Sequence, residues 1–253
     1  MIKRILSSII MCIIVCTLFL LKTNGVIALT CLITGAIFYE ILRIDKKSNL
    51  YQICFISIYL ITTLILLIKN QPFIPYLTHY LIPLLFIYIL VELWSKKTIV
   101  RNLFFNHIKM FLVLTMSSIC ILKLYSLNLK LFLILIIYVS LTDTLSYFFG
   151  RKFGKNKLSS ISPNKTVEGF IYSYILLSIG IIFVIKINIF PLTYSLFLFL
   201  IPPFSLLGDL HESLYKREKN IKNSSELIPG HGGFYDRFDS YILALPCYYF
   251  FIL

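Results

Sequence analysis

The sequence predicts an all-α, polytopic membrane protein with about nine transmembrane helices. The chain of 253 residues is 58% hydrophobic and only 14% charged, and its mean hydropathy is +0.88, whereas a soluble domain carries about 25% charged residues. The apolar residues are gathered in runs that approach the ~20 residues needed to cross a bilayer. Between these runs, connections rich in Lys and Arg alternate with connections that are poor in them.

The predicted helices follow one another along the whole chain. The first apolar run comes after Lys3 and Arg4, but it is too long for the apolar part of a signal peptide and no small-x-small cleavage site follows it, so we expect a retained transmembrane helix. Each later run is separated from its predecessor by a connection that contains at least one Lys. In the eighth run, Pro202 and Pro203 are expected to break the helix. The nine runs are Ile5–Leu21, Val26–Leu42, Tyr51–Ile68, Tyr76–Trp94, Met110–Leu127, Leu131–Phe149, Phe170–Ile185, Phe190–Leu207 and Phe238–Leu253.

The alternation of basic connections predicts the orientation in the membrane. One side collects 18 Lys and Arg residues and the other side 5, with Arg237 beginning the last span. Because loops rich in Lys and Arg stay in the cytoplasm, we expect a cytoplasmic N-terminus and a C-terminus outside. The chain is therefore predicted to be an integral membrane protein, in the inner membrane if its source is bacterial.

Acidic residues are scarce, and their positions indicate a site. Ionisable groups within membrane spans are costly and are usually functional. Two pairs are spaced three residues apart, so each pair shares a helix face. Hard Mg²⁺ prefers carboxylate oxygen together with substrate phosphates, although salt bridges to neighbouring Lys and Arg would also explain the acids. Five carboxylates approach one membrane surface from three predicted helices: Asp143, Asp209, Glu212, Asp236 and Asp239.

Two polar loops accompany these acids. The loop Gly150–Gly169 combines cations, hydroxyls and Gly154, and the segment Pro229–Gly233 reads PGHGG. Consecutive glycines let backbone N–H groups approach a ligand closely, and Lys, Ser and Thr donate hydrogen bonds to phosphate oxygens. The alternative interpretation of each loop is a solvated basic loop that binds no ligand. Taken with the acids, the loops predict a phosphate-binding site for a nucleotide, a phospholipid headgroup or both.

This arrangement closely resembles the phosphatidate cytidylyltransferase family, also called CDP-diacylglycerol synthases. The stretches GDLHES at Gly208–Ser213 and DTLSYFFGRKFGKNKLSSISPNKTVEG at Asp143–Gly169 are similar to family motifs. Asn223 stands where the family has Asp, which removes a charge. The C-terminal signature of the family is matched, with its spacing unbroken, by Ser213, Lys216, Arg217, Lys222, Ser225, Pro229, His231, Gly232, Gly233, Phe234, Asp236, Arg237 and Asp239.

The resemblance implies a reaction and roles for the matched residues. The family reaction transfers the cytidylyl group of CTP to phosphatidate, giving CDP-diacylglycerol and pyrophosphate, in phospholipid biosynthesis. Asp209 and Asp236 are expected to hold Mg²⁺, with K⁺ as a candidate second cation. The expected catalytic residues are Asp209, Asp236, Lys222 and His231. The expected substrate-binding residues are Ser162, Lys165, Thr166, Ser213, Lys216, Arg217, Gly232, Gly233 and Arg237, and the expected supporting residues are Asp143, Glu212 and Asp239.

The predicted organisation is one integral-membrane domain over residues 1–253. An apolar helical scaffold occupies 1–128 and a cytoplasm-facing catalytic region occupies 143–239. The expected partners are CTP, phosphatidate and membrane lipids, and no nucleic acid is expected to bind. The oligomeric state stays open, with a homodimer as the candidate assembly. Three other functions stay open from the residues alone: a cytidylyltransferase for a different lipid phosphate, an organic-anion or phosphate transporter, and an inactive scaffold relative. Transporters favour sites at the membrane midplane, whereas these polar residues cluster at one face.

Overall fold

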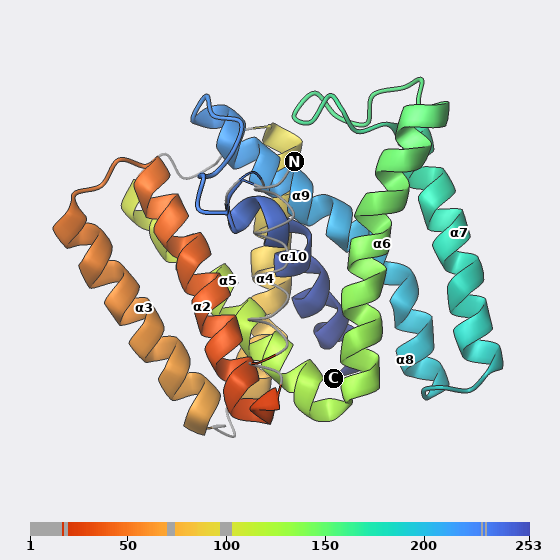
Figure 1. Ribbon diagram of the computed structural model, residues 1–253, viewed down its shortest axis with the longest axis horizontal. Coiled ribbons are helices and arrows are strands. Elements are labelled where there is room, and N and C mark those ends of the chain that lie inside the picture. Colours follow the sequence, from red (N-terminus) through yellow and green to blue (C-terminus); the bar gives the residue numbers. More distant parts are fainter. Residues whose placement is uncertain (1–16, 18–19, 70–73, 97–102, 229, 231) are drawn as a thin grey trace.

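The protein is a bundle of α-helices (Figure 1). The computed structural model describes residues 17, 20–69, 74–96, 103–228, 230 and 232–253. Within this part of the chain the helices are α2 (Lys22–Ile44), α3 (Asn49–Lys69), α4 (Ile74–Ser95), α5 (Leu103–Leu127), α6 (Leu129–Phe153), α7 (Val167–Lys186), α8 (Leu192–Phe197), the 3₁₀ turn η1 (Leu198–Leu200), α9 (Ile201–Glu218) and α10 (Tyr235–Ile252).

The described helices confirm an all-α, polytopic membrane protein. Seven helical segments are long and apolar enough to cross a membrane, and they coincide with the second to eighth predicted spans. The first predicted span, Ile5–Leu21, lies almost entirely outside the described residues. The ninth forms α10, which is helical as expected but carries three charged side chains in its first two turns and falls outside the set of seven.

Local sequence accounts for the ends of several helices. Thr166 begins α7 by accepting a hydrogen bond on its side chain from Gly169 N at 3.2 Å, and Asn128 does the same for α6. Such caps satisfy backbone N–H groups that have no partner within the helix. Pro202 and Pro203 are the second and third residues of α9, which begins at Ile201 directly after η1. The predicted break in the eighth span is therefore confirmed, because the prolines start a new helix instead of continuing α8.

Helix α10 joins two apolar cores. Leu245 and Tyr248 pack with the buried side chains of α6, α7 and α9, while Ile242 and Leu243 pack with those of α2, α3 and α5. In Figure 1, α3 and α7 lie at opposite edges of the bundle and α10 lies between them. The outer helices expose many large apolar side chains, as expected for surfaces that face lipid.

Two glycines allow helices to approach closely beside the polar end of the bundle. A Cβ atom on Gly208 of α9 would lie 2.5 Å from the carbonyl oxygen of Asp239 on α10. A Cβ atom on Gly169 of α7 would lie 2.6 Å from the carbonyl oxygen of Ser146 on α6. Because no side chain fits at either position, α9 packs directly on α10 and α7 on α6. These contacts bring the polar residues of four helices to one end of the molecule.

Candidate active site

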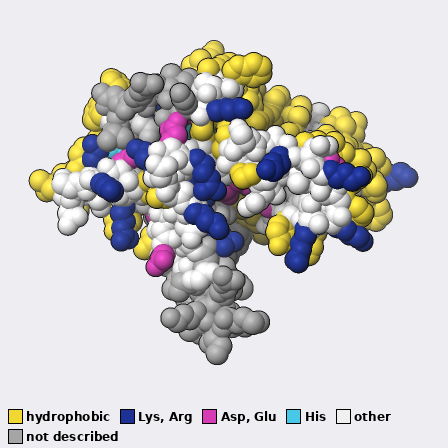
Figure 2. Space-filling view, turned by 90° about the horizontal axis from the view of Figure 1, so that it is seen from above, with side chains coloured by type: hydrophobic (Ala, Val, Ile, Leu, Met, Phe, Trp, Pro, Cys, Tyr) yellow, Lys and Arg dark blue, Asp and Glu magenta, His cyan; other side chains and the backbone are white. Residues whose placement is uncertain are grey.

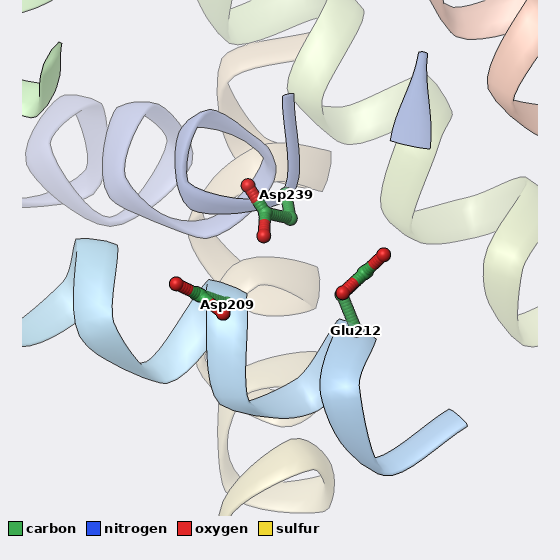
Figure 3. A group of neighbouring side chains, drawn as sticks. All are labelled: Asp209, Glu212 and Asp239. Atoms are coloured by element: carbon green, nitrogen blue, oxygen red, sulfur yellow. The ribbon is translucent and has the colours of Figure 1, made fainter. Parts of the chain in front are cut away.

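Three carboxylates meet between α9 and α10 (Figure 3). Asp209 and Glu212 project from consecutive turns of α9, and Asp239 faces them from α10. Each contributes an oxygen atom, and these atoms all lie within 4.8 Å of one another. Glu212 is only 1% exposed. Three oxygen donors at this spacing form a donor set of the kind that hard divalent cations bind.

A fourth carboxylate, Asp143 of α6, lies beside this group. Its Oδ2 accepts a hydrogen bond from Ser240 Oγ at 3.0 Å, and its Oδ1 accepts one from Ser205 Oγ at 3.4 Å. These hydroxyls come from α10 and α9, so the Asp143 side chain is fixed by the same two helices that carry the other three acids. The predicted gathering of acids from three helices is thus present in the fold.

A cavity opens next to Asp143 and Asp209. Its volume is about 340 Å³, within the range of small-molecule sites. It lies between α6, the α6–α7 loop, α7 and α9. Its lining residues are Thr142, Asp143, Ser146, Tyr147, Leu158, Ser162, Asn164, Lys165, Thr166, Phe170, Leu206 and Asp209. Three residues expected to bind substrate, Ser162, Lys165 and Thr166, therefore share one cavity with two of the acids.

The α6–α7 loop holds Lys165 in this cavity. Leu158 N donates to Lys165 O at 2.8 Å, and the carboxylate of Glu168 accepts hydrogen bonds from Lys155 N at 3.0 Å and Asn156 N at 3.1 Å. The loop is thereby tied to the start of α7. The ammonium group of Lys165 forms an ion pair with Asp209, so a cation from this loop reaches the acidic group directly.

Asp236 lies on the other side of the acidic group and faces the α9–α10 loop. Its carboxylate accepts hydrogen bonds from Lys216 Nζ at 2.7 Å, Ser224 N at 3.0 Å and Gly233 N at 2.9 Å. Lys216 also lies 2.6 Å from Glu212. The carboxylate of Asp239, rather than that of Asp236, joins Asp209 and Glu212 in the group of three. Lys216 links this group to Asp236.

The glycines of the α9–α10 loop adopt a tight turn. Gly232 has a φ of +90°, a backbone conformation that favours glycine. Ile228 N donates to Gly232 O at 2.9 Å, which closes the turn. A Cβ atom on Gly233 would lie 2.6 Å from both carboxylate oxygens of Glu40. His231, expected to be catalytic, and Pro229 lie outside the described residues.

The remaining predicted residues lie at the same end of the bundle. Ser213 Oγ approaches Asp209 Oδ1 at 3.5 Å. Arg217, Lys222 and Arg237 are exposed there, and Arg217 Nη1 donates to Ile221 O at 3.2 Å. Figure 2 shows Lys and Arg side chains spread over this face, with hydrophobic side chains along its rim. The face thus offers many cations around a recessed acidic group.

Sequence reasoning missed Glu40 of α2. This side chain is 0% exposed, and it accepts hydrogen bonds from Ser225 Oγ at 2.6 Å, Phe234 N at 2.9 Å and Tyr235 N at 2.9 Å. It therefore contacts the loop that carries the glycines. The sequence did carry a signal for Glu40, because an acid within an apolar span is costly wherever it lies. Its hydrogen-bond partners are distant in the sequence, so the sequence did not show what Glu40 contacts.

Asp45, directly after α2, was missed in the same way. Its Oδ2 lies 2.8 Å from His107 Nε2 and 2.9 Å from Tyr215 OH, and its Oδ1 lies 2.5 Å from Lys219 Nζ. Burial raises the pKa of Asp45, but the bonds from His107, Lys219 and Tyr215 outweigh burial and hold its pKa below the ordinary value. Asp45 therefore ties the end of α2 to the end of α9.

Glu92 of α4 makes a third connection of this kind. Lys109 Nζ lies 2.9 Å from Glu92 Oε2, and His211 Nε2 lies 3.3 Å from the same oxygen. Glu92 is 0% exposed. His211 lies between Asp209 and Glu212 in the sequence, so Glu92 supports the turn of α9 that presents two of the acids. The segment 1–128, expected to be an apolar scaffold, thus supplies three acids that contact the region 143–239, which is expected to be catalytic.

Comparisons with known proteins agree with the family resemblance of the sequence. A phosphatidate cytidylyltransferase of Staphylococcus haemolyticus is 46% identical over 112 residues, which is 43% of this chain and 43% of that protein. One of Staphylococcus saprophyticus is 46% identical over 121 residues, 46% of this chain and 45% of that protein. One of Bacillus subtilis is 44% identical over 113 residues, 43% of this chain and 42% of that protein.

These alignments span less than half the length of each relative. The model of the family described as "Cytidylyltransferase family" extends much further, because it matches residues 2–253. Because this match covers nearly the whole chain, the chain belongs to the cytidylyltransferase family.

Proposed function

We propose that this protein transfers the cytidylyl group of CTP to phosphatidate, giving CDP-diacylglycerol and pyrophosphate, in phospholipid biosynthesis. The observation that carries the proposal is the group Asp209, Glu212 and Asp239 beside a cavity that is also lined by Lys165. The reaction joins two phosphate compounds that repel each other. A site that combines metal-binding carboxylates with cations is suited to bring them together.

The donor set fits Mg²⁺ as the cofactor. Carboxylate oxygens from Asp209, Glu212 and Asp239 are hard ligands within 4.8 Å of one another, and Mg²⁺ binds through few carboxylates together with substrate phosphates. When bound, the ion would polarise phosphate oxygens and neutralise developing negative charge. Asp236, next to Lys216, is the proposed contributor to a second site for K⁺. Asp143 is the proposed support for the acidic group.

The chain's own side chains position the reactants. In the proposed reaction an oxygen of the phosphatidate phosphate forms a bond to the α-phosphorus of CTP, and the bond from that phosphorus to the β-phosphate oxygen breaks, so that pyrophosphate leaves. Lys165, Ser162 and Thr166 line the cavity and can donate to one phosphate. The donors proposed for the other phosphates are Ser213, Lys216, Arg217, Lys222, His231, Gly232, Gly233 and Arg237. Holding both reactants in line supplies much of the catalysis.

The proposal includes an orientation. Nine spans, with a cytoplasmic N-terminus and the C-terminus outside, would place the site at the cytoplasmic surface, where CTP is available. The distribution of Lys and Arg over the site face (Figure 2) supports this orientation. The C-terminal end of the chain lies at the opposite end of the bundle from the two loops (Figure 1). Residues 1–253 would form one integral-membrane domain, with the catalytic region over 143–239.

A direct assay tests the function. Purified protein in mixed micelles with phosphatidate, radiolabelled CTP and Mg²⁺ should form labelled CDP-diacylglycerol, and EDTA should abolish the product. Asp209→Asn should lower kcat at least ~100-fold, because several kcal/mol of charge stabilisation depends on bound metal. Glu226→Gln, a change on the exposed surface of the α9–α10 loop, serves as the matched control. Product formed only with a polyprenyl phosphate, or no transfer from CTP at all, would overturn the proposal.

A further inference from the structure

Glu40 contacts the loop between α9 and α10 on both sides of its glycine turn. Its two carboxylate oxygens accept hydrogen bonds from Ser224 Oγ at 2.9 Å, Ser225 Oγ at 2.6 Å, Phe234 N at 2.9 Å and Tyr235 N at 2.9 Å. Two of these donors lie before the glycine turn and two lie directly after it. A single side chain of α2 thus holds the two backbone segments on either side of the glycine turn.

The contact also completes the start of α10. This helix begins at Tyr235 and has no side-chain cap of its own. The first N–H groups of a helix lack partners within it and favour a negative charge nearby. Glu40 supplies both the acceptor and the charge from another helix. Its hydrogen bonds to Phe234 N and Tyr235 N therefore set the position from which α10 begins.

The shape of the glycine turn depends on this carboxylate. A Cβ atom on Gly233 would lie 2.6 Å from each oxygen of Glu40, so the loop backbone packs directly on the carboxylate. Ser224 Oγ lies 2.9 Å from Glu40 and 3.1 Å from Asp236. Because a hydroxyl has one hydrogen, Ser224 connects the two acids and shares its donor between them. Glu40 is thereby coupled to the carboxylate that binds Lys216.

We infer that Glu40 is a positioning residue for the phosphates of the nucleotide. It holds the α9–α10 loop so that Lys222 and Gly232 present their donors to a polyphosphate, while the Gly233 N–H stays bound to Asp236. This inference rests on the proposed function, because that proposal assigns the loop to substrate phosphates. Glu40 itself is completely buried and acts through the loop. A residue that served only to stabilise the bundle would have no reason to affect one substrate more than the other.

The expected effect of Glu40→Gln is specific to CTP. Loss of the charge weakens the hydrogen bonds on both sides of the glycine turn, so the binding-competent shape of the loop is less populated and the apparent affinity for CTP falls by the same factor. We expect the KM for CTP to rise about tenfold, equivalent to about 1.4 kcal/mol. We expect kcat, and the KM for phosphatidate, to change less than about threefold, since bound CTP restores the loop.

Two further variants make the comparison sharp. Glu40→Asp keeps the charge on a shorter side chain and should lie between wild type and Glu40→Gln in KM for CTP. Glu226→Gln removes the same charge from an exposed position on the same loop and should leave the KM for CTP unchanged. A fall in kcat with no change in the KM for CTP, or equal changes in the KM of both substrates, would overturn the inference.

Hydrogen exchange tests the anchoring without relying on activity. In Glu40→Gln, the amides of Ser224, Phe234 and Tyr235 should exchange faster than in Glu226→Gln, while those of α6 should not change. If Glu40→Gln does not fold, Ser225→Ala removes the 2.6 Å donor and should give a smaller effect of the same pattern. If the wild type makes no CDP-diacylglycerol, the proposed function fails, and exchange alone then decides whether Glu40 holds the loop. If the exchange rates of these amides were unchanged in Glu40→Gln and in Ser225→Ala, Glu40 would not anchor the loop.

Discussion

The contact between Gly208 and α10 permits a quantitative prediction. In Gly208→Ala the new Cβ would lie 2.5 Å from Asp239 O and 3.1 Å from Ser240 Cα, and ordinary contact begins at 3.4 Å. The obstacle is backbone, so α9 and α10 must move apart by about 0.9 Å, the difference between 3.4 Å and 2.5 Å. This movement separates Asp209 from Asp239. A misplacement of about 1 Å can lower a rate by about 100-fold.

The assay is initial-rate cytidylyl transfer as a function of Mg²⁺ concentration. We expect Gly208→Ala to lower kcat by about 100-fold and to raise the Mg²⁺ concentration needed for half-maximal rate. The free energy of unfolding of Gly208→Ala should fall by about 1–3 kcal/mol, as for other overpacked sites. Gly180→Ala is the control, because its Cβ would meet only the end of the Tyr138 side chain, at 2.9 Å. If the two variants had equal kcat and equal Mg²⁺ dependence, the contact would not set the geometry of the acids.

Three other changes give distinct outcomes. Asp239→Asn should raise the Mg²⁺ concentration for half-maximal rate by about 10- to 100-fold, as for altered metal sites; an unchanged titration would remove Asp239 from the site. Asp45→Asn should lower the unfolding free energy by about 1.5–3 kcal/mol at pH 7 through its charged hydrogen bonds. Because the folded pKa of Asp45 is depressed, this difference should begin to shrink as pH falls below about 4, the pKa of an unperturbed Asp, and should vanish only below the lower folded pKa; a difference that did not shrink at all on acidification would contradict the assignment. Asn223→Asp, beside the exposed Lys222, should raise the rate roughly two- to fivefold if an exposed ion pair orients that lysine, and a rate that stayed the same or fell would show that Asn223 is no handicap.

Much of the fold follows from local pattern. The second to eighth spans were predicted correctly, because the hydropathy and length of a span depend only on residues that are neighbours in the sequence. The break at Pro202 followed from the same kind of local rule. For the site, the spacing of three residues correctly placed Asp209 and Glu212 together on α9.

The same spacing was insufficient for Asp236 and Asp239. Asp236 lies in the first turn of α10, where its carboxylate turns toward the N–H groups of Ser224 and Gly233. Asp239 lies one turn later in α10, beyond these N–H groups, and its carboxylate faces α9. Spacing along a helix places two side chains on one face, but the donors available at each position decide which ligand each carboxylate takes.

The acids of the N-terminal half were beyond the reach of pattern. Glu40 and Ser224 are 184 residues apart, and Asp45 and Tyr215 are 170 apart. No periodicity relates such positions. The packing of α2 and α10 against α5 brings Glu40 to its donors, so the sequence alone indicates that these acids are costly but not what they bind.

The long separation between Glu40 and its donors has a consequence for biosynthesis. Helix α2 emerges from the ribosome well before Ser224, Ser225 and Tyr235 have been translated. Glu92 can pair early with Lys109, which follows it by only 17 residues, but Glu40 must wait for nearly the entire polypeptide. The carboxylate of Glu40 therefore stays without these four donors until the α9–α10 loop and the start of α10 have been made.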